Sequence, residues 1–327
     1  ASSPILPLRP LLVTRDSRSM RRGLFLFSVL LIFTACASVQ PTANTWSGPE
    51  TLARIEAPNT HEISGLAASR IRPDILWTHN DSGDQPVLRA VDSQGRVRAM
   101  VTIRGARHRD WEDMASFTLN GIAYLLVGEV GDNNGVRTDC VFYLIREPTI
   151  PPTDHVQNLF VDIERTIPFR YEDGPRDCES IAIDVAAQQI FLISKRTKPA
   201  VAYQLSLTGD SQVARRLGPL HGIPEPSGLF AHVKMPAGLY RAQPCAFDIS
   251  SDGRAAVVLT YGEIYLYPKR EGMTWRDAFA SEPLVIASHG LPQAEAVCFS
   301  ADNRQIIVTT EGHPAPLLRY TRQSDPL

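Results

Sequence analysis

A short motif that recurs five times along the chain constrains the fold more than any other feature. Each copy has a polar residue, one intervening residue, a Glu, Ser or Cys, and then small and apolar residues that suit a buried strand. The recurring Glu, Ser or Cys positions are Ser64, Glu112, Glu179, Cys245 and Glu295. Five aligned copies indicate a repeat protein.

A second residue follows each copy after 15 to 17 positions, behind a short apolar run. These residues are His79, Glu129, Lys195, Tyr261 and Glu311. The copies themselves are 48, 67, 66 and 50 residues apart, and a four-stranded propeller blade takes roughly 40–50 residues. We therefore predict an all-β fold, a β-propeller with five blades, in which the longer intervals hold one blade and a long loop. Six blades is the alternative, with a degenerate blade in residues 224–242.

The two ends of the chain are predicted to meet in one sheet. The last repeat has too few residues for a fourth strand, so residues 46–57 are expected to supply its outer strand and close the ring, which leaves no open sheet edge. Residues 159–169 are predicted to form the outer strand of the second repeat. We further expect a long loop over residues 218–242, which are rich in Pro and Gly, and a short helical turn over residues 275–280.

The N-terminal segment carries a charge pattern of its own. Residues 1–35 hold five Arg and one acidic residue, so the remainder has 28 basic and 34 acidic residues and a formal charge of −6. That balance argues against a nucleic-acid partner. Met20-Arg21-Arg22 followed by the apolar run over residues 24–35 is typical of a signal peptide that begins at Met20, and the run is too short to span a bilayer.

The end of this segment, Ile32-Phe33-Thr34-Ala35-Cys36, resembles the lipobox of bacterial lipoproteins. The resemblance implies lipidation at Cys36, a tether over residues 36–47 and a folded domain over residues 48–327. It also implies an exported protein that is anchored in the outer membrane and faces the periplasm, and we expect a monomer. A plain secretory signal is the alternative. The other four cysteines, Cys140, Cys178, Cys245 and Cys298, are compatible with disulfides or with small buried side chains.

Repeat geometry predicts where chemistry would take place. The first strands of all blades line the channel of a propeller, so equivalent side chains converge at one mouth, and residues two apart on a strand point the same way. The predicted catalytic residues are Glu112, Glu179 and Lys195. The predicted ligand-binding residues are His79, Asn80, Asp110, Glu129, Arg196, Tyr261, Glu295 and Glu311. The predicted metal ligands are Glu62, Asp81, Asp132 and Asp177.

An acidic funnel of this kind favours a bound cation. Carboxylates a few ångströms apart raise each other's pKa unless a cation neutralises them, and Ca²⁺ prefers six to eight oxygen ligands. We expect a metal-assisted hydrolase in which Glu112 or Glu179 accepts a proton and Lys195 stabilises negative charge. The alternative is that these carboxylates serve packing between blades. The chain has no GxSxG, P-loop, HExxH or CxxC motif.

Several segments resemble a group of bacterial exported proteins of unassigned function, which is related to the propeller group that contains phytase-like and esterase-like proteins. The segments are His79-Asn80-Asp81-Ser82-Gly83-Asp84, Asp110-Trp111-Glu112-Asp113, Gly131-Asp132-Asn133, Lys195-Arg196 and Asp248-Ile249-Ser250-Ser251-Asp252-Gly253. The likeness covers nearly the whole chain behind Cys36 and implies a β-propeller. Propeller phytases hold Ca²⁺ ions in an acidic mouth that binds phosphate, so the resemblance implies a small anionic ligand and hydrolysis of phosphoesters or other esters. The alternative is a non-catalytic envelope module that binds a glycan, peptide or protein.

Overall fold

The computed structural model describes residues 45–57, 59–209 and 212–323. The chain divides into two units, Ala1–Thr42 and Ala43–Leu327, and the description below concerns the second. The proposed signal peptide and Cys36 lie outside the described residues. Strands dominate, with one α-helix, α1 (Trp275–Phe279), and one 3-10 helix, η1 (Leu229–His232), in the described part. The all-β prediction is confirmed.

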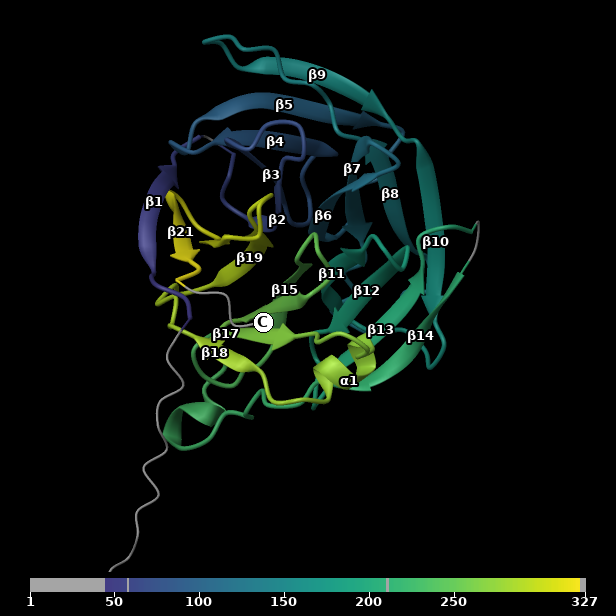
Figure 1. Cartoon of the computed structure of the whole chain (residues 1–327), viewed down its shortest axis with the longest axis vertical. Coiled ribbons are helices and arrows are strands. Elements are labelled where there is room, and N and C mark those ends of the chain that lie inside the picture. Colours follow the sequence, from purple (N-terminus) through teal and green to yellow (C-terminus); the bar gives the residue numbers. More distant parts are fainter. Residues whose placement is uncertain (1–44, 58, 210–211, 324–327) are drawn as a thin grey trace, which may run out of the picture. The chain divides into compact units, whose positions relative to one another are not determined.

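The strands form four hydrogen-bonded sheets within the described ranges (Figure 1). The first contains β2 (Ile63–Ala68), β3 (Ile75–Asn80), β4 (Val87–Asp92), β5 (Val97–Arg104) and β9 (Gln157–Asp162). The second contains β6 (Trp111–Leu119), β7 (Ile122–Glu129), β8 (Cys140–Arg146), β10 (Arg165–Tyr171), β14 (Gln212–Pro219), β13 (Val201–Ser206), β12 (Gln189–Ser194) and β11 (Cys178–Asp184). The third contains β15 (Pro244–Ile249), β16 (Ala255–Thr260), β17 (Ile264–Pro268) and β18 (Leu284–Ile286), and the fourth contains β19 (Ala294–Phe299), β20 (Gln305–Thr310), β21 (Ala315–Thr321) and β1 (Glu50–Ile55).

The sheets are arranged around a common centre. Five strands lie innermost in Figure 1, namely β2, β6, β11, β15 and β19, and each contacts the next, with β19 returning to β2. Each of them is the first strand of a run of antiparallel neighbours. The arrangement is consistent with a β-propeller. Within the described residues no helix is both long and apolar enough to cross a membrane.

The N-terminal strand closes the last sheet. β1 pairs antiparallel with β21, with Ile55 opposite Ala315 and Glu50 opposite Arg319, and Trp46 forms a further bridge to Arg322. Ile55 is fully buried. The prediction that residues 46–57 supply the outer strand beside the C-terminal strand is therefore confirmed.

One predicted strand is wrong. Residues 159–169 do not form a single strand, because the chain breaks after β9 and resumes as β10. β9 pairs parallel with β5 of the first sheet, whereas β10 pairs antiparallel with β8 and parallel with β14. The break lets one segment serve two sheets, and the β10–β14 pairing joins two antiparallel sets into the eight-stranded sheet.

The long loop and the short helix occur where the sequence places them. Residues 220–243 hold η1 and no strand, so residues 224–242 contain no degenerate blade. α1 begins behind Thr274, whose side chain accepts a hydrogen bond from the Asp277 backbone N–H while Asp277 bonds back to Thr274. This reciprocal capping box satisfies N–H groups that a helix start leaves unpaired.

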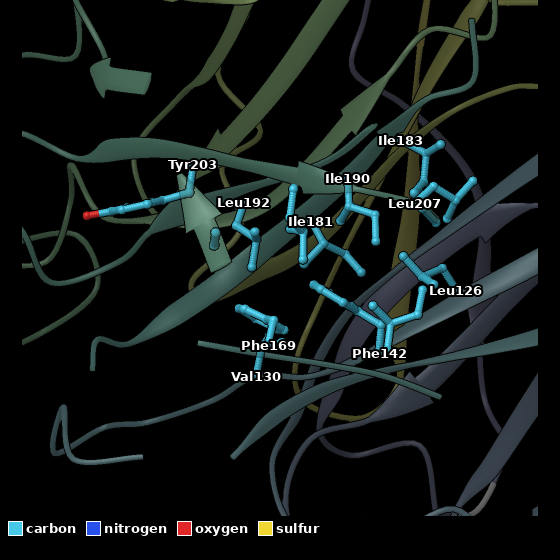
Figure 2. Close-up of a cluster of buried hydrophobic side chains, with 14 of the residues drawn as sticks. Leu126, Val130, Phe142, Phe169, Ile181, Ile183, Ile190, Leu192, Tyr203 and Leu207 are labelled. Atoms are coloured by element: carbon cyan, nitrogen blue, oxygen red, sulfur yellow. The ribbon is translucent and has the colours of Figure 1, made fainter. Parts of the chain in front are cut away.

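Apolar side chains fill the spaces between neighbouring strand sets. Figure 2 shows one such cluster, in which Leu126, Phe142 and Phe169 from β7, β8 and β10 face Ile181 and Leu192 from β11 and β12. The rings of Phe142 and Phe169 stack with centroids 4.8 Å apart. Truncating one such buried side chain to Ala typically costs about 2–5 kcal/mol. These apolar clusters between strand sets hold the inner strands in fixed positions, and the side chains at the centre are fixed with them.

Two buried carboxylates join the inner strands to one another. Asp113 Oδ2 accepts hydrogen bonds from the backbone N–H of Ile181 at 2.9 Å and of Phe247 at 3.2 Å, which ties β6 to β11 and β15. Asp248 Oδ2 accepts one from Phe299 N at 2.8 Å and ties β15 to β19. Asp113 and Asp248 thus show a packing role of the kind that the alternative interpretation assigns to the recurring acids.

Candidate functional site

The recurring motif corresponds to a shift in strand register near the start of every inner strand. The register between each inner strand and its neighbour shifts by one residue. In three strands the shift falls at a single residue, namely Ser64 in β2, Cys245 in β15 and Glu295 in β19. In β6 and β11 it falls at two residues, Glu112 or Glu179 and the residue that follows. An extra residue of this kind bends a strand and re-aims its side chain, and such bulges are common beside active sites. The motif therefore turns one side chain per inner strand out of the ordinary ladder.

Lys195 lies at the centre of one group of these side chains. Its buried Nζ contacts Glu179 Oε2 directly, donates to the Tyr261 hydroxyl at 2.9 Å and lies 4.0 Å from Glu295 Oε2. The Tyr261 hydroxyl donates to Glu295 Oε1 at 2.5 Å. Burial of a lone ammonium group is very costly, so the two carboxylates account for the presence of Lys195 inside the protein.

A second group consists of carboxylates around Glu112. One oxygen each from Asp81, Asp110 and Glu112 lies within 4.8 Å of the others, and the same holds for Glu112, Asp177 and Glu179. Glu112 belongs to both groups and is only 2% exposed. The carboxylates therefore form one continuous cluster with Glu112 in the middle.

Burial and mutual repulsion change the acidity of this cluster. Burial, followed by the nearby charge of Asp81, raises the pKa of Glu112 well above its usual range. The same two causes raise the pKa of Asp110 to about 6, and burial raises the pKa of Asp81. Ionised carboxylates at this spacing destabilise one another unless a proton or a cation intervenes.

Close contacts with Ser64 and Gly131 hold Glu112 in place. Ser64 Oγ donates to the Glu112 carbonyl at 2.5 Å and lies 3.4 Å from its Oε2. Gly131 lies against the same carboxylate, since a Cβ there would stand 2.5 Å from Asp110 Oδ2 and closer still to Glu112 Oε1. Only glycine fits at this position without displacing the two acids.

Buried Arg137, which is not among the predicted site residues, fixes the loop that carries Gly131. It donates to the Gly131 carbonyl at 2.6 Å, pairs with Glu129 Oε1 at 2.9 Å, and its backbone N–H donates to Asp132 Oδ2 at 2.7 Å. Glu129 Oε2 also accepts the N–H of Arg109 at 2.9 Å. Glu129 and Asp132 thus bind protein groups in the loop and position Asp110 and Gly131. No local motif marks Arg137; its sole signal is that it follows the Gly131-Asp132-Asn133 segment.

Arg196 gives the site a cation that solvent can reach. Its Nε lies 2.6 Å from Asp177 Oδ2, it contacts Asn133 Oδ1, and its side chain is 40% exposed. Asp177 Oδ1 accepts the backbone N–H of Asp132 at 2.9 Å. Asp177 therefore joins the carboxylate cluster to a partly exposed guanidinium group.

The remaining predicted residues lie around these groups. Exposed Glu62 accepts the Asp81 N–H through its carbonyl at 2.7 Å. Glu311 accepts from Gln293 at 2.5 Å, and burial with the charge of Glu295 raises the pKa of Glu311 to about 7.

His79 and Asn80 are buried and contact groups outside the carboxylate cluster. Burial lowers the pKa of His79 to about 3, so the ring stays neutral, and it packs edge-on against Trp111 at 5.4 Å. The Asn80 side chain donates to Asp84 and to the Asn59 carbonyl, both at 2.9 Å. Both residues support the segment that carries Asp81. Cys140, Cys178, Cys245 and Cys298 are buried and free, and burial raises the pKa of each thiol, which disfavours the reactive thiolate.

No protein-family model and no curated protein matches this chain. Function is therefore inferred from the site itself. The cluster offers hard oxygen ligands for a divalent cation, a buried ammonium paired with two carboxylates, and an accessible guanidinium. Such a set can bind a cation together with an anionic group.

Proposed function

We propose that this chain is a five-bladed β-propeller whose mouth binds Ca²⁺ and, beside it, a small anionic ligand. The ring of five inner strands supports the blade count, since each begins its own antiparallel set and no further set lies in the described residues. We further propose that the protein is an exported lipoprotein, anchored at Cys36 in the outer membrane.

The observation that carries the metal proposal is the position of Glu112. Lys195 compensates Glu179 and Glu295, and Arg196 compensates Asp177, whereas no salt bridge reaches Asp81, Asp110 or Glu112 within the described ranges. Three neighbouring acids thus have no ion-pair partner among the described residues. Because Glu112 is shared by both groups of three, we propose that it bridges two Ca²⁺ ions, with Asp81 and Asp110 on one side and Asp177 and Glu179 on the other. Oxygen atoms of the bound ligand and of water would complete the six to eight oxygen ligands that Ca²⁺ prefers.

The cationic side chains support an anionic ligand and ester hydrolysis. Arg196 is exposed enough to bind a phosphate or carboxylate with its fork of donors. Bound metal would polarise the ester and acidify the attacking water. In this scheme Glu179 accepts the proton of the attacking water. Lys195 Nζ and the Tyr261 hydroxyl, which lie 2.9 Å apart, would stabilise negative charge on the ester oxygen during attack. The substrate class is a phosphoester or another ester.

Calorimetry with Ca²⁺ tests the metal proposal. The full chain, with Cys36→Ser to prevent acylation, is stripped with a chelator and titrated with CaCl₂. We expect saturable binding below millimolar Ca²⁺ and its loss in Glu112→Gln. Glu164→Gln serves as the matched control, because Glu164 pairs with Arg146 on the exposed surface. Absence of binding at millimolar Ca²⁺ in the parent protein rejects the proposal.

The second candidate is a non-catalytic module that binds a glycan, peptide or protein in the envelope. The contacts that join Glu179, Lys195, Tyr261 and Glu295 favour it, because these side chains are already engaged with one another. A screen of phosphoesters and acyl esters with and without Ca²⁺ separates the two functions. Calcium-dependent turnover that Glu179→Gln abolishes supports the hydrolase, and calcium binding without turnover supports the binding module.

A further inference from the structure

The loop between β14 and β15 exposes three large apolar side chains on one short segment. Leu229 in η1 is 89% exposed, Val233 is 44% exposed and Met235 is 42% exposed. Transfer of one such side chain out of water is worth about 1.5–3 kcal/mol, so leaving three in solvent forgoes several kcal/mol. Clustered exposed apolar residues mark interaction sites more often than scattered ones do.

The loop holds these side chains outward through its own hydrogen bonds. Leu239 N donates to the Val233 carbonyl at 2.9 Å, and Gly238 N donates to the Met235 carbonyl at 3.0 Å. The backbone N–H of Ala231 bonds to the carbonyl of Gly228 at 3.3 Å, which closes the turn around η1. A compact loop of this kind is often functional. The three apolar side chains thus project from a loop whose backbone is held by its own hydrogen bonds.

The charge of the loop differs from that of the rest of the domain. Residues 226–243 contain no Asp or Glu, whereas residues 36–327 have a formal charge of −6. His232 and Lys234 are exposed beside the apolar residues, and neither takes part in an ion pair among the described residues. Apolar side chains interleaved with basic ones are typical of segments that enter the headgroup region of a bilayer.

The loop lies beside the proposed mouth. The Arg241 carbonyl accepts the N–H of Gly262 at 2.9 Å, directly after Tyr261. Leu239 and Ala242 line a small cleft together with Lys195 and Arg196. In Figure 1 this green segment projects below β18, across the molecule from β9. The base of the loop therefore lies next to Lys195 and Arg196, whereas its tip projects outward from the domain (Figure 1).

We propose that this loop docks onto a phospholipid surface that contains anionic lipid, with Leu229, Val233 and Met235 inserted among the headgroups and Lys234 beside a phosphate. A stable protein interface uses roughly 20–30 residues on each side, and this loop offers only three exposed apolar side chains. Three such side chains suffice for shallow insertion into the headgroup region of a bilayer. The proposed acyl anchor at Cys36 precedes Glu50 by 14 residues, which at about 3.5 Å per residue keeps the domain within reach of the membrane. The inference is independent of metal binding.

A tryptophan reporter at the tip tests the docking. Leu229→Trp is introduced into the full chain with Cys36→Ser, and emission is recorded with brominated phosphatidylcholine vesicles, with and without phosphatidylglycerol. The four native Trp residues are at most 5% exposed, so the new side chain dominates any change. We expect a shift to shorter wavelength with bromine quenching, strongest with phosphatidylglycerol, and affinity reduced about fivefold by Lys234→Glu.

The matched control carries the reporter at Phe160, which is 60% exposed on β9. Vesicles bound through the N-terminal apolar segment would affect both reporters alike. Quenching at position 229 that exceeds quenching at position 160 supports the docking. Equal responses at the two positions, or an unshifted spectrum at position 229 with both vesicle compositions, overturn it and leave a protein partner as the occupant to seek.

Discussion

The ammonium group of Lys195 donates a 2.9 Å hydrogen bond to the hydroxyl of Tyr261, a residue 66 positions later in the chain. The two residues directly follow β12 and β16, the second strands of two neighbouring sets, and occupy equivalent places in the repeat. Repetition of one strand pattern thus places chemically different side chains around one centre.

Removal of the Lys195 ammonium should destabilise the protein strongly. Lys195→Met leaves Glu179 and Glu295 buried without their cation, and breaking a buried pair in this way typically costs about 3–5 kcal/mol. Urea unfolding gives the free energy. Lys198→Met is the matched control, because its ion pair with Glu225 is about half exposed and should contribute little. Similar losses in both variants would argue against a special role for the central ammonium.

Gly131→Ala should weaken Ca²⁺ binding. The added methyl group would overlap Glu112 Oε1 and Asp110 Oδ2 and so displace both oxygens, and we expect the affinity to fall by at least about fivefold, which is about 1 kcal/mol of binding free energy. Calorimetry measures the change. Gly128→Ala, whose Cβ would meet its nearest neighbours at 3.3 Å, serves as the control. Unchanged affinity in Gly131→Ala would mean that the two acids do not both hold the ion.

Ca²⁺ affinity should rise with pH. Burial raises the pKa of Asp110 to about 6, so the ion must displace the Asp110 proton at pH 5, whereas Asp110 is already ionised at pH 8. One such proton weakens binding at pH 5 by roughly tenfold. The metal-free protein should show the linked effect: its folded state holds the Asp110 proton to higher pH than the unfolded chain does, so stability declines as pH rises from about 4 to 6. Calorimetry at both pH values measures the affinity, and stronger binding at pH 5 would contradict the scheme.

The N-terminal strand should contribute to the stability of the whole domain. Ile55→Ala removes a fully buried side chain from β1, and we expect a loss of about 2–5 kcal/mol in the free energy of unfolding. Arg54→Ala, at the adjacent exposed position, should change stability by less than about 0.5 kcal/mol. A single cooperative transition in both variants would indicate that β1 folds with the rest of the domain. Independent loss of β1 would show that it only covers an edge.

The repeat made much of this architecture predictable. Ser64, Glu112, Glu179, Cys245 and Glu295 each lie second in an inner strand, because equivalent positions in a radial array occupy equivalent places around the axis. The same reasoning anticipated that Lys195 and Tyr261 would approach Glu179 and Glu295. It also anticipated β1 beside β21, since the last repeat lacked a strand.

Features that depend on contacts between distant strands were not predictable. Residues 157–171 alternate as one strand would, yet β9 and β10 join different sheets. No local motif marks Arg137, because its partners, Glu129 and the Gly131 carbonyl, become apparent only once the loop is folded. The roles of Asp113 and Asp248 in linking inner strands likewise depend on register, which a single sequence does not specify.

Anomalous diffraction from crystals of the chain grown with Ca²⁺ or soaked in Mn²⁺ tests the central claim most directly. The account predicts two peaks at the mouth, one among Asp81, Asp110 and Glu112 and one among Glu112, Asp177 and Glu179, with Glu112 bound to both and both peaks lost in Glu112→Gln. A mouth without any peak at millimolar metal, with these carboxylates bonded only to protein groups or protons, would contradict it.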